Sequence, residues 1–169
     1  MRDVKAEKNH IPGEDELRRL ALKLILEQTT MTLATAHEDI AWSAPVYYVN
    51  RDFNFYFFSD PESRHIKESM RTGHASASIY APASSWRDIR GIQMSGSVKA
   101  LSPGFEAVNI LRIYLKKYPF TEEFFDSGQK IDLGALLKRF RVRLYNFNPD
   151  LLYYMDNSIR FGFRGRIGL

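Results

Sequence analysis

The sequence predicts an α+β protein in which antiparallel strands form a barrel, with helices at its ends and between strands. Stretches of alternating, β-branched and aromatic residues recur along the chain and are separated by short turn sequences. Segments with helical spacing of apolar residues lie before and between them. The chain has 169 residues, of which 44% are hydrophobic, so one sizeable core is expected. We therefore expect a single domain over residues 1–169, with the barrel over about 30–163.

An amphipathic helix is expected near the N-terminus, over about residues 13–28. Pro12 and the acidic run at 14–16 favour a helix start at this point. Apolar residues then recur three and four positions apart, which is typical of a helix that packs on a core: Leu17, Leu20, Ala21, Leu24 and Ile25.

Three strands are expected next, at residues 31–36, 40–49 and 53–59. Their β-branched and alternating apolar residues contrast with the spacing of the preceding helix. Because only the acidic pair 38–39 and the polar residues 50–52 separate them, the three strands are predicted to form a β-meander.

A short helix, ending at residue 72, is expected directly after the third strand. Asp60 is a suitable N-cap, the proline that follows it is a suitable first helical residue, and Gly73 is a suitable stop. Ile66 and Met70 lie one turn apart and are expected to face inward.

Two more strands are expected at residues 74–81 and 89–101. The first carries small residues on both faces, which suits close packing against another layer. In the second, Gly91 and Gly96 are expected to mark bulges or close approaches of the backbone.

The C-terminal third is expected to contain helices followed by strand. Ser102 as N-cap and the proline after it open a helix that Pro119 ends. Its predicted inward residues are Val108, Leu111 and Leu115. Residues 120–140 predict one or two short helices. The remainder of the chain, from residue 140 on, is rich in Tyr, Phe and Leu and predicts strand, with a corner at residues 148–150.

Composition excludes several classes of site and protein. The absence of cysteine excludes disulfide scaffolds, thiolate metal sites and thiol catalysis, and it fits a cytoplasmic protein. No apolar segment is long enough for a signal peptide or a membrane span. The four histidines show no metal-ligand spacing. The net charge is +4, and residues 138–169 hold seven basic and two acidic residues, which suits an anionic ligand, nucleic acid or simple solubility.

The start of the helix after Asp60 predicts an anion site. A helix N-terminus presents unpaired N–H groups and a partial positive charge. Here Ser63, Arg64 and His65 add a hydroxyl, a guanidinium and an imidazole within one turn, and Lys67 lies one turn further along. These residues indicate a phosphate site. The alternative is that they only cap the helix or face solvent, and the Asp60 carboxylate would compete with an anion for the same N–H groups.

The order of four segments resembles the flavin-binding split-barrel family related to pyridoxamine 5'-phosphate oxidase, over residues 30–155. The segments are SAPVYYV, FNFYFFSDPESRHIKES, HASASIY and RGIQMSGSVKAL. The resemblance implies an antiparallel split β-barrel that binds FMN and forms a homodimer with cofactor sites at its interface. The residues that it implies at the ring and ribityl chain are Ser43, Ala44, Pro45, Val46 and Tyr48. Phe58 and Ser59 would lie beside the ribityl chain or phosphate, and Ser63, Arg64 and His65 would hold the phosphate.

The sequence also departs from that family. The oxidase itself has Arg at the position of Ser43 and Lys at the positions of Tyr48 and His65. Arg64 is therefore expected to hold most of the phosphate charge. The oxidase grips its substrate with an Arg-x-His pair near the C-terminus, whereas the last histidine here is His74. This difference argues against the oxidase reaction.

Two further segments, IRGIQMSG and LLYYMDNSIRFGFRGRIGL, resemble an uncharacterised bacterial branch of the family. In that branch Gln93 would contact the flavin edge or the partner subunit; a bond to a neighbouring backbone is an equal alternative. Trp86 could stack on a flavin or only pack against protein. The glycines at 162, 165 and 168 mimic a dinucleotide fingerprint, but no strand leads from them into a helix.

Three functions follow as hypotheses. The first is an FMN-dependent oxidoreductase without classical catalytic residues, which acts on an unidentified small molecule, with a nicotinamide nucleotide as electron donor. The second is a non-catalytic carrier or sensor of flavin or haem on the same barrel. The third, nucleic-acid binding through the basic C-terminal segment, is disfavoured because that segment has the pattern of a strand.

Overall fold

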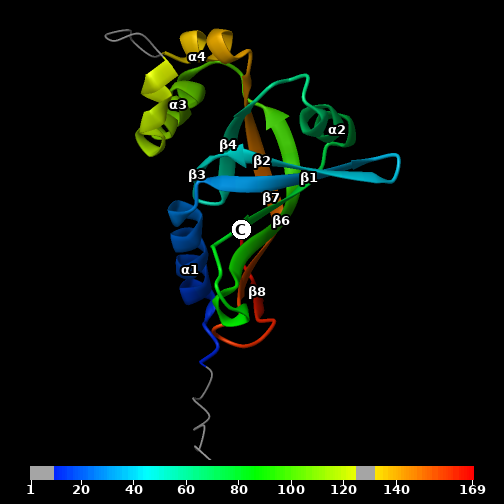
Figure 1. Cartoon of the computed structure of the whole chain (residues 1–169), viewed down its shortest axis with the longest axis vertical. Helices are drawn as coiled ribbons and strands as arrows, with labels where there is room; N and C mark the ends of the chain where they lie inside the picture. Colours follow the sequence, from blue (N-terminus) through cyan, green and yellow to red (C-terminus); the bar gives the residue numbers. More distant parts are fainter. Residues whose placement is uncertain (1–9, 125–131) are drawn as a thin grey trace, which may run out of the picture.

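The computed structural model describes residues 10–124 and 132–169 and is built around an eight-stranded antiparallel sheet (Figure 1). Its helices and strands are α1 (Glu14–Glu27), β1 (Thr30–His37), β2 (Ile40–Tyr47), β3 (Val49–Arg51), β4 (Asn54–Ser59), α2 (Arg64–Thr72), β5 (Ala75–Tyr80), η1 (Trp86–Asp88), β6 (Arg90–Ala100), α3 (Phe105–Lys117), η2 (Pro119–Phe124), α4 (Leu133–Phe140), β7 (Arg143–Asp156) and β8 (Arg164–Arg166). The α+β class and the antiparallel sheet predicted from the sequence are confirmed. None of these helices is both long and apolar enough to cross a membrane.

The sheet curls so that its two edges approach each other. Its strand order is β2-β1-β5-β6-β7-β4-β3, with β8 paired to β7, so β2 and β3 lie at opposite ends of the order. In the chain, however, only Tyr48 separates these two strands, and β2 lies in contact with β4. The two edges are therefore neighbours in space but do not pair with each other, so the sheet forms a partly open barrel.

The predicted β-meander is wrong. β1 and β2 form a hairpin, but β4 pairs with β3 and β7 and not with β2. The reason is the break at Tyr48, whose side chain is fully buried and whose hydroxyl donates to the carbonyl of Ile25 at 2.6 Å. This inward turn moves the chain from one edge of the sheet to the other, where Phe57 stacks on Tyr145 of β7.

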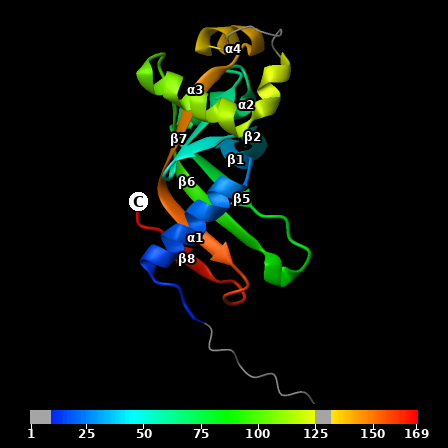
Figure 2. The ribbon, with the colours of Figure 1, turned by 90° about the vertical axis from the view of Figure 1, so that its left-hand side faces the viewer.

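The main core lies inside the barrel and under α1 (Figure 2). The predicted N-terminal helix is confirmed as α1, and the inward stripe of that helix is buried as expected, at Leu17, Ala21, Leu24 and Ile25. Leu20 packs partly buried against the same core. Aromatic side chains from β4 and β7 fill the centre: Phe55, Phe57, Tyr145 and Phe147.

A second core lies under α3, at the end of the molecule opposite α1 (Figures 1 and 2). α3 begins at Phe105, after Gly104, and not at Pro103. Of its predicted inward residues, Leu111 is buried, Leu115 is half-buried and Val108 is exposed. The inward face is instead Ala107, Ile110, Leu111 and Tyr114. Residues 125–131, within the predicted helical stretch 120–140, lie outside the described residues.

α2 also begins later than predicted. It starts at Arg64 with Ser63 in the N-cap position, because the Asp60 carboxylate accepts the N–H of Glu62 at 2.8 Å and closes a separate turn before the helix. Gly73 ends the helix with φ 73°, as predicted. Met70 does not face inward but is 41% exposed; the buried side chains of α2 are Ile66, Glu68 and Ser69.

The two glycines of β6 lie at close approaches, as predicted. A Cβ at Gly96 would lie 2.2 Å from the carbonyl oxygen of Asn148, and one at Gly91 would lie 2.9 Å from that of Ile79. The register between β6 and β7 shifts at Gly96 and leaves Asp150 without an opposite residue. The corner predicted at 148–150 is therefore a bulge within a continuous strand.

Candidate functional site

A cluster of hydroxyl and imidazole groups lies where β4 ends and α2 begins. Ser59 is the last residue of β4 and is buried, and its Oγ lies 2.8 Å from Nε2 of His65. The Oγ of Ser63 lies 3.3 Å from both of these atoms and donates to the carbonyl of Asp60 at 2.7 Å. We call Ser59, Ser63 and His65 the hydroxyl–imidazole cluster.

The imidazole of this cluster is neutral at neutral pH. Burial lowers the pKa of His65, and the nearby Glu68 carboxylate opposes this shift only in part. A neutral imidazole has one donor and one acceptor nitrogen. The cluster can therefore exchange hydrogen bonds with a ligand, but it carries no positive charge until His65 takes up a proton.

Arg64 belongs to a neighbouring hydrogen-bond network at the same helix start, with different partners. Its Nε donates to Oε1 of Glu68 at 2.6 Å, and its guanidinium carbon lies 4.7 Å from the centre of the Trp42 ring. The other Glu68 oxygen accepts from the Thr35 hydroxyl at 2.5 Å. Glu68 is 6% exposed, and hydrogen bonds from Thr35 and then Arg64 lower its pKa. This carboxylate is therefore ionised, with both oxygens bonded.

The sequence prediction placed Ser63, Arg64 and His65 in one small volume. The structure brings Ser63 and His65 together with Ser59, but among the described residues no hydrogen bond joins Arg64 to this cluster. Sequence reasoning missed Glu68, although its spacing of four residues from Arg64 is that of a helical ion pair. Thr35 and Trp42 carry no such local signal.

The first-turn N–H groups of α2 are not taken by the carboxylate of Asp60. That carboxylate bonds to Glu62 in the preceding turn, so the competition considered from the sequence does not occur. First-turn N–H groups have no intrahelical partner. Lys67, which lies one turn into the helix, forms an exposed ion pair with Glu62 at 2.9 Å.

β2 passes beside α2 as an edge strand. Its register pairs Ser43 with Ala34 and Pro45 with Thr32 of β1. Ser43 and Pro45 are exposed, whereas the alternate side chains, Ala44 and Val46, are half-buried. Within the described residues the other edge of β2 has no paired strand, and Pro45, which lacks an N–H, suits such an edge.

The side chains of Tyr48 and Phe58 face away from the hydroxyl–imidazole cluster. Tyr48 points into the main core, and burial raises the pKa of its hydroxyl well above the usual range. The ring of Phe58 packs edge-on against Tyr114 in the second core, with ring centres 5.0 Å apart. Neither side chain therefore contributes to the cluster.

Gln93 lies on the same face of the sheet as Ser43 and Pro45. Register places Pro45, Thr32, Ser78 and Gln93 in one row across four strands. Gln93 is therefore three strand spacings, about 14 Å, from Pro45. Its Oε1 accepts from Arg164 at 3.5 Å. The structure thus puts Gln93 on the same sheet face as Ser43 and Pro45, but not beside them within one copy of the chain.

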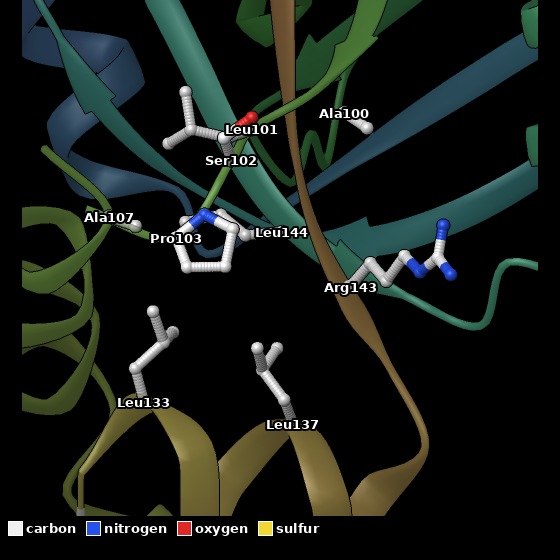
Figure 3. Close-up of a pocket in the computed structure, with 9 residues that line it drawn as sticks. All are labelled: Ala100, Leu101, Ser102, Pro103, Ala107, Leu133, Leu137, Arg143 and Leu144. Atoms are coloured by element: carbon white, nitrogen blue, oxygen red, sulfur yellow. The ribbon is translucent and has the colours of Figure 1, made fainter.

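A separate cavity of about 360 Å³ lies between α3, α4 and the adjoining ends of β6 and β7 (Figure 3). Leu133 and Leu137 point across it towards Pro103 and Leu144, while the guanidinium of Arg143 points away. The lining is mostly apolar, and none of the predicted cofactor-binding residues contributes to it. In the described part of the chain, no group of three or more His, Asp or Glu side chains is placed to hold a metal ion.

Comparison with known proteins gives distant sequence relatives. The chain matches no protein-family model. It is 23% identical over 138 residues to a UPF0306 protein of Klebsiella pneumoniae, a match that covers 80% of this chain and 82% of the relative. It is 25% identical over 140 residues to a UPF0306 protein of Enterobacter, covering 82% and 87%.

Several solved structures resemble this protein closely in fold but only weakly in sequence. A haem-binding protein from Mycobacterium smegmatis superposes with a TM-score of 0.65 at 14% identity, covering 93% of this chain and 58% of that one. A Listeria innocua protein provisionally assigned as a pyridoxamine 5'-phosphate oxidase gives 0.61 at 12% identity, covering 83% and 98%. An FAD-binding protein from Mesorhizobium loti gives 0.57 at 16% identity, covering 79% and 90%.

At these identities the likeness establishes the fold and nothing finer. The split β-barrel expected from the sequence is confirmed, since the curled antiparallel sheet with flanking helices superposes on these proteins over most of the chain. Structural neighbours with this fold include binders of flavin and of haem. The chain is thus an α+β protein with the antiparallel split-barrel fold.

Proposed function

We propose that this protein binds FMN at the hydroxyl–imidazole cluster and the start of α2, and that it is an FMN-dependent oxidoreductase. The observation that carries the proposal is the group of hydroxyl and imidazole side chains gathered at one point. Ser59, Ser63 and His65 lie within 3.3 Å of one another, beside the first-turn N–H groups of α2. Arg64, in the same turn, supplies a guanidinium.

These residues fit the phosphate of FMN. A phosphate dianion is stabilised by hydroxyl and N–H donors, by the positive end of a helix dipole and by a guanidinium. Each of these groups is present here, and Asp60 does not compete for the N–H groups. A proton taken up by His65 would add a second positive charge.

The exposed edge of β2 supports a place for the flavin ring. Ser43, Ala44, Pro45 and Val46 offer small side chains and an unpaired strand edge. In this proposal the ring lies along that edge, and its ribityl chain runs towards Ser59. Tyr48 and Phe58 would contact the ligand through their backbones.

A homodimer belongs to this proposal. The face of β2, β1, β5 and β6 that points away from the core carries small side chains, and we call it the outer face: Thr32, Ala34, Ser43, Pro45, Ser76, Ser78 and Ser95. Small side chains on this face would allow a second sheet to approach closely. A second copy packed on this face would bring its Gln93 near the flavin site of the first.

Bound FMN would supply hydride transfer, and the protein would supply binding and orientation. The β2 edge would hold one face of the flavin, and the partner copy would exclude water from it. No side chain is required as a general acid or base, so we assign no catalytic residue. The substrate would be a small molecule, with a nicotinamide nucleotide as electron donor. We expect a cytoplasmic protein without nucleic-acid partners.

A non-catalytic carrier or sensor is the second candidate. It is favoured by the haem-binding structural neighbour, whose TM-score of 0.65 exceeds that of the FAD-binding one. The absorbance spectrum of the purified protein separates these functions, because flavin and haem absorb at different wavelengths. Oxidation of a nicotinamide nucleotide in the presence of FMN then separates an enzyme from a carrier.

The replacement Arg64→Ala tests the site directly. It should weaken FMN binding at least about tenfold, since a hydrogen bond to a charged group contributes about 1.5–3 kcal/mol. Arg71→Ala is the matched control, because Arg71 lies in the last turn of the same helix and contacts His37. Stoichiometric FMN on Arg64→Ala after gel filtration, or no FMN binding by the unaltered protein, would contradict the proposal.

A further inference from the structure

The network around Arg64 joins three elements to one guanidinium. Glu68 comes from the same helix, Thr35 from β1 and Trp42 from β2, and Thr35 and Trp42 are directly opposite each other in the β1–β2 ladder. The guanidinium lies over the Trp42 ring, while its Nε bonds to Glu68. Arg64 is thus held at two points, by a carboxylate on its edge and an indole on its face.

Glu68 cannot release Arg64 at low cost. The carboxylate is buried and ionised, and after release only the hydroxyl of Thr35 would remain bonded to it. A buried charge that loses its partner is strongly destabilising. Arg64 therefore keeps its bond to Glu68 when a ligand arrives, and it meets the ligand through the guanidinium nitrogens that Glu68 does not use.

We infer that Glu68, supported by Thr35, is a positioning residue that fixes where Arg64 holds the anionic group of the ligand. The inference rests on the proposed FMN function and adds to it the residues that set the position of the anion. It opposes a simpler expectation from charge alone, by which a carboxylate so close to the site repels the phosphate and lowers affinity.

The experiment compares FMN with riboflavin, which lacks the phosphate, by titration of flavin fluorescence. Glu68→Ala should weaken FMN binding about tenfold, because Arg64 loses its fixed position, and should leave riboflavin affinity unchanged. Glu68→Gln, which can still accept from Arg64, should recover part of the loss. Thr35→Val, which removes only the supporting hydroxyl and keeps the side-chain shape, should weaken FMN about threefold.

Glu62→Ala is the matched control, since it removes one exposed carboxylate from the same region without touching Arg64. It should strengthen FMN binding slightly or leave it unchanged. If Glu68→Ala also leaves FMN affinity unchanged or raises it, or if it weakens riboflavin equally, the positioning role is overturned while FMN binding stands. If the unaltered protein binds no FMN, both proposals are overturned. Thermal unfolding of each variant establishes that it is folded.

Discussion

At the scale of single residues, neighbours in sequence have different surroundings. Arg64 and His65 are adjacent, yet Arg64 faces Glu68 and Trp42, while His65 faces Ser59 and Ser63. Successive side chains of a helix point about 100° apart, so a run of polar residues in a first turn need not meet at one ligand. The charge and the neutral donors of this site are therefore controlled by separate residues.

The pH dependence of FMN binding should report on His65. Burial lowers its pKa in the free protein, whereas a nearby phosphate would favour the imidazolium and raise that pKa. Binding should then take up a proton, and affinity should rise as the pH falls through the titration of His65. Affinities measured between about pH 5.5 and 8 test this.

His65→Gln is the reference for that experiment, because the phosphate of FMN itself titrates near pH 6. The variant keeps a side-chain donor but cannot gain a charge. The difference between the two pH profiles isolates the imidazole. Parallel profiles would show that His65 does not contact the anion.

Lys117 should make stability depend on pH. Its amine is buried without a hydrogen-bond partner among the described residues, 4.1 Å from the centre of the Tyr48 ring. Burial lowers the pKa of Lys117 from 10.5 to about 8. Between these values the unfolded chain binds more protons than the folded one, so the free energy of unfolding should rise with pH. Raised tyrosine pKa values oppose this rise above about pH 10.

Lys117→Met removes the buried amine and keeps most of the side-chain volume. The variant should be more stable at neutral pH by on the order of 1 kcal/mol, and its advantage should shrink as the pH approaches about 9.5. Urea unfolding of both proteins at the two pH values measures this. An advantage that is the same at both would mean that the amine does not titrate in this window.

At the scale of elements, local sequence signals predicted the existence of helices and strands better than their boundaries and their pairing. α1 and β5 follow the predicted ranges closely because their apolar spacing is local. α2 and α3 begin later than predicted, because a polar residue followed by proline is as typical of a turn or bend as of a helix start. Here it precedes a turn before α2 and a bend before α3. The partner of β4 could not be predicted, since β7 lies far along the chain.

The bulge between β6 and β7 should tolerate no side chain at Gly96. A Cβ there would lie 2.2 Å from the backbone oxygen of Asn148, which cannot turn aside as a side chain could. Gly96→Ala should lower the free energy of unfolding by about 2 kcal/mol or more. Gly104→Ala is the control, because a Cβ on Gly104 would have no neighbour within 4 Å among the described residues. Equal urea midpoints for the two variants would contradict the close approach.

At the scale of the whole molecule, the curled sheet leaves only one large face uncovered by the described residues. The inner side of the sheet faces the main core and is covered by α1. The strands around β4 are covered on their other side by α3. The outer face of β2, β1, β5 and β6 is covered by no described element. The sequence indicated the proposed anion site through one helix start. The outer face could not be predicted, because residues from four strands form it and only their register brings them together.

The outer face should be where two copies meet, and Ala34 lies near its centre, flanked by Ser43 and Ser76 in the register. Ala34→Arg would place a long charged side chain between two closely packed sheets, and desolvation of that charge should dissociate the dimer. Light scattering after gel filtration should give a dimer for the unaltered protein and a monomer for this variant.

Ser102→Arg places the same side chain on the exposed loop before α3 and should remain dimeric. Because a dimer interface would complete the flavin site with Gln93 from the partner copy, Ala34→Arg should also lose FMN affinity. A monomeric unaltered protein, or a dimeric Ala34→Arg, would place the interface elsewhere.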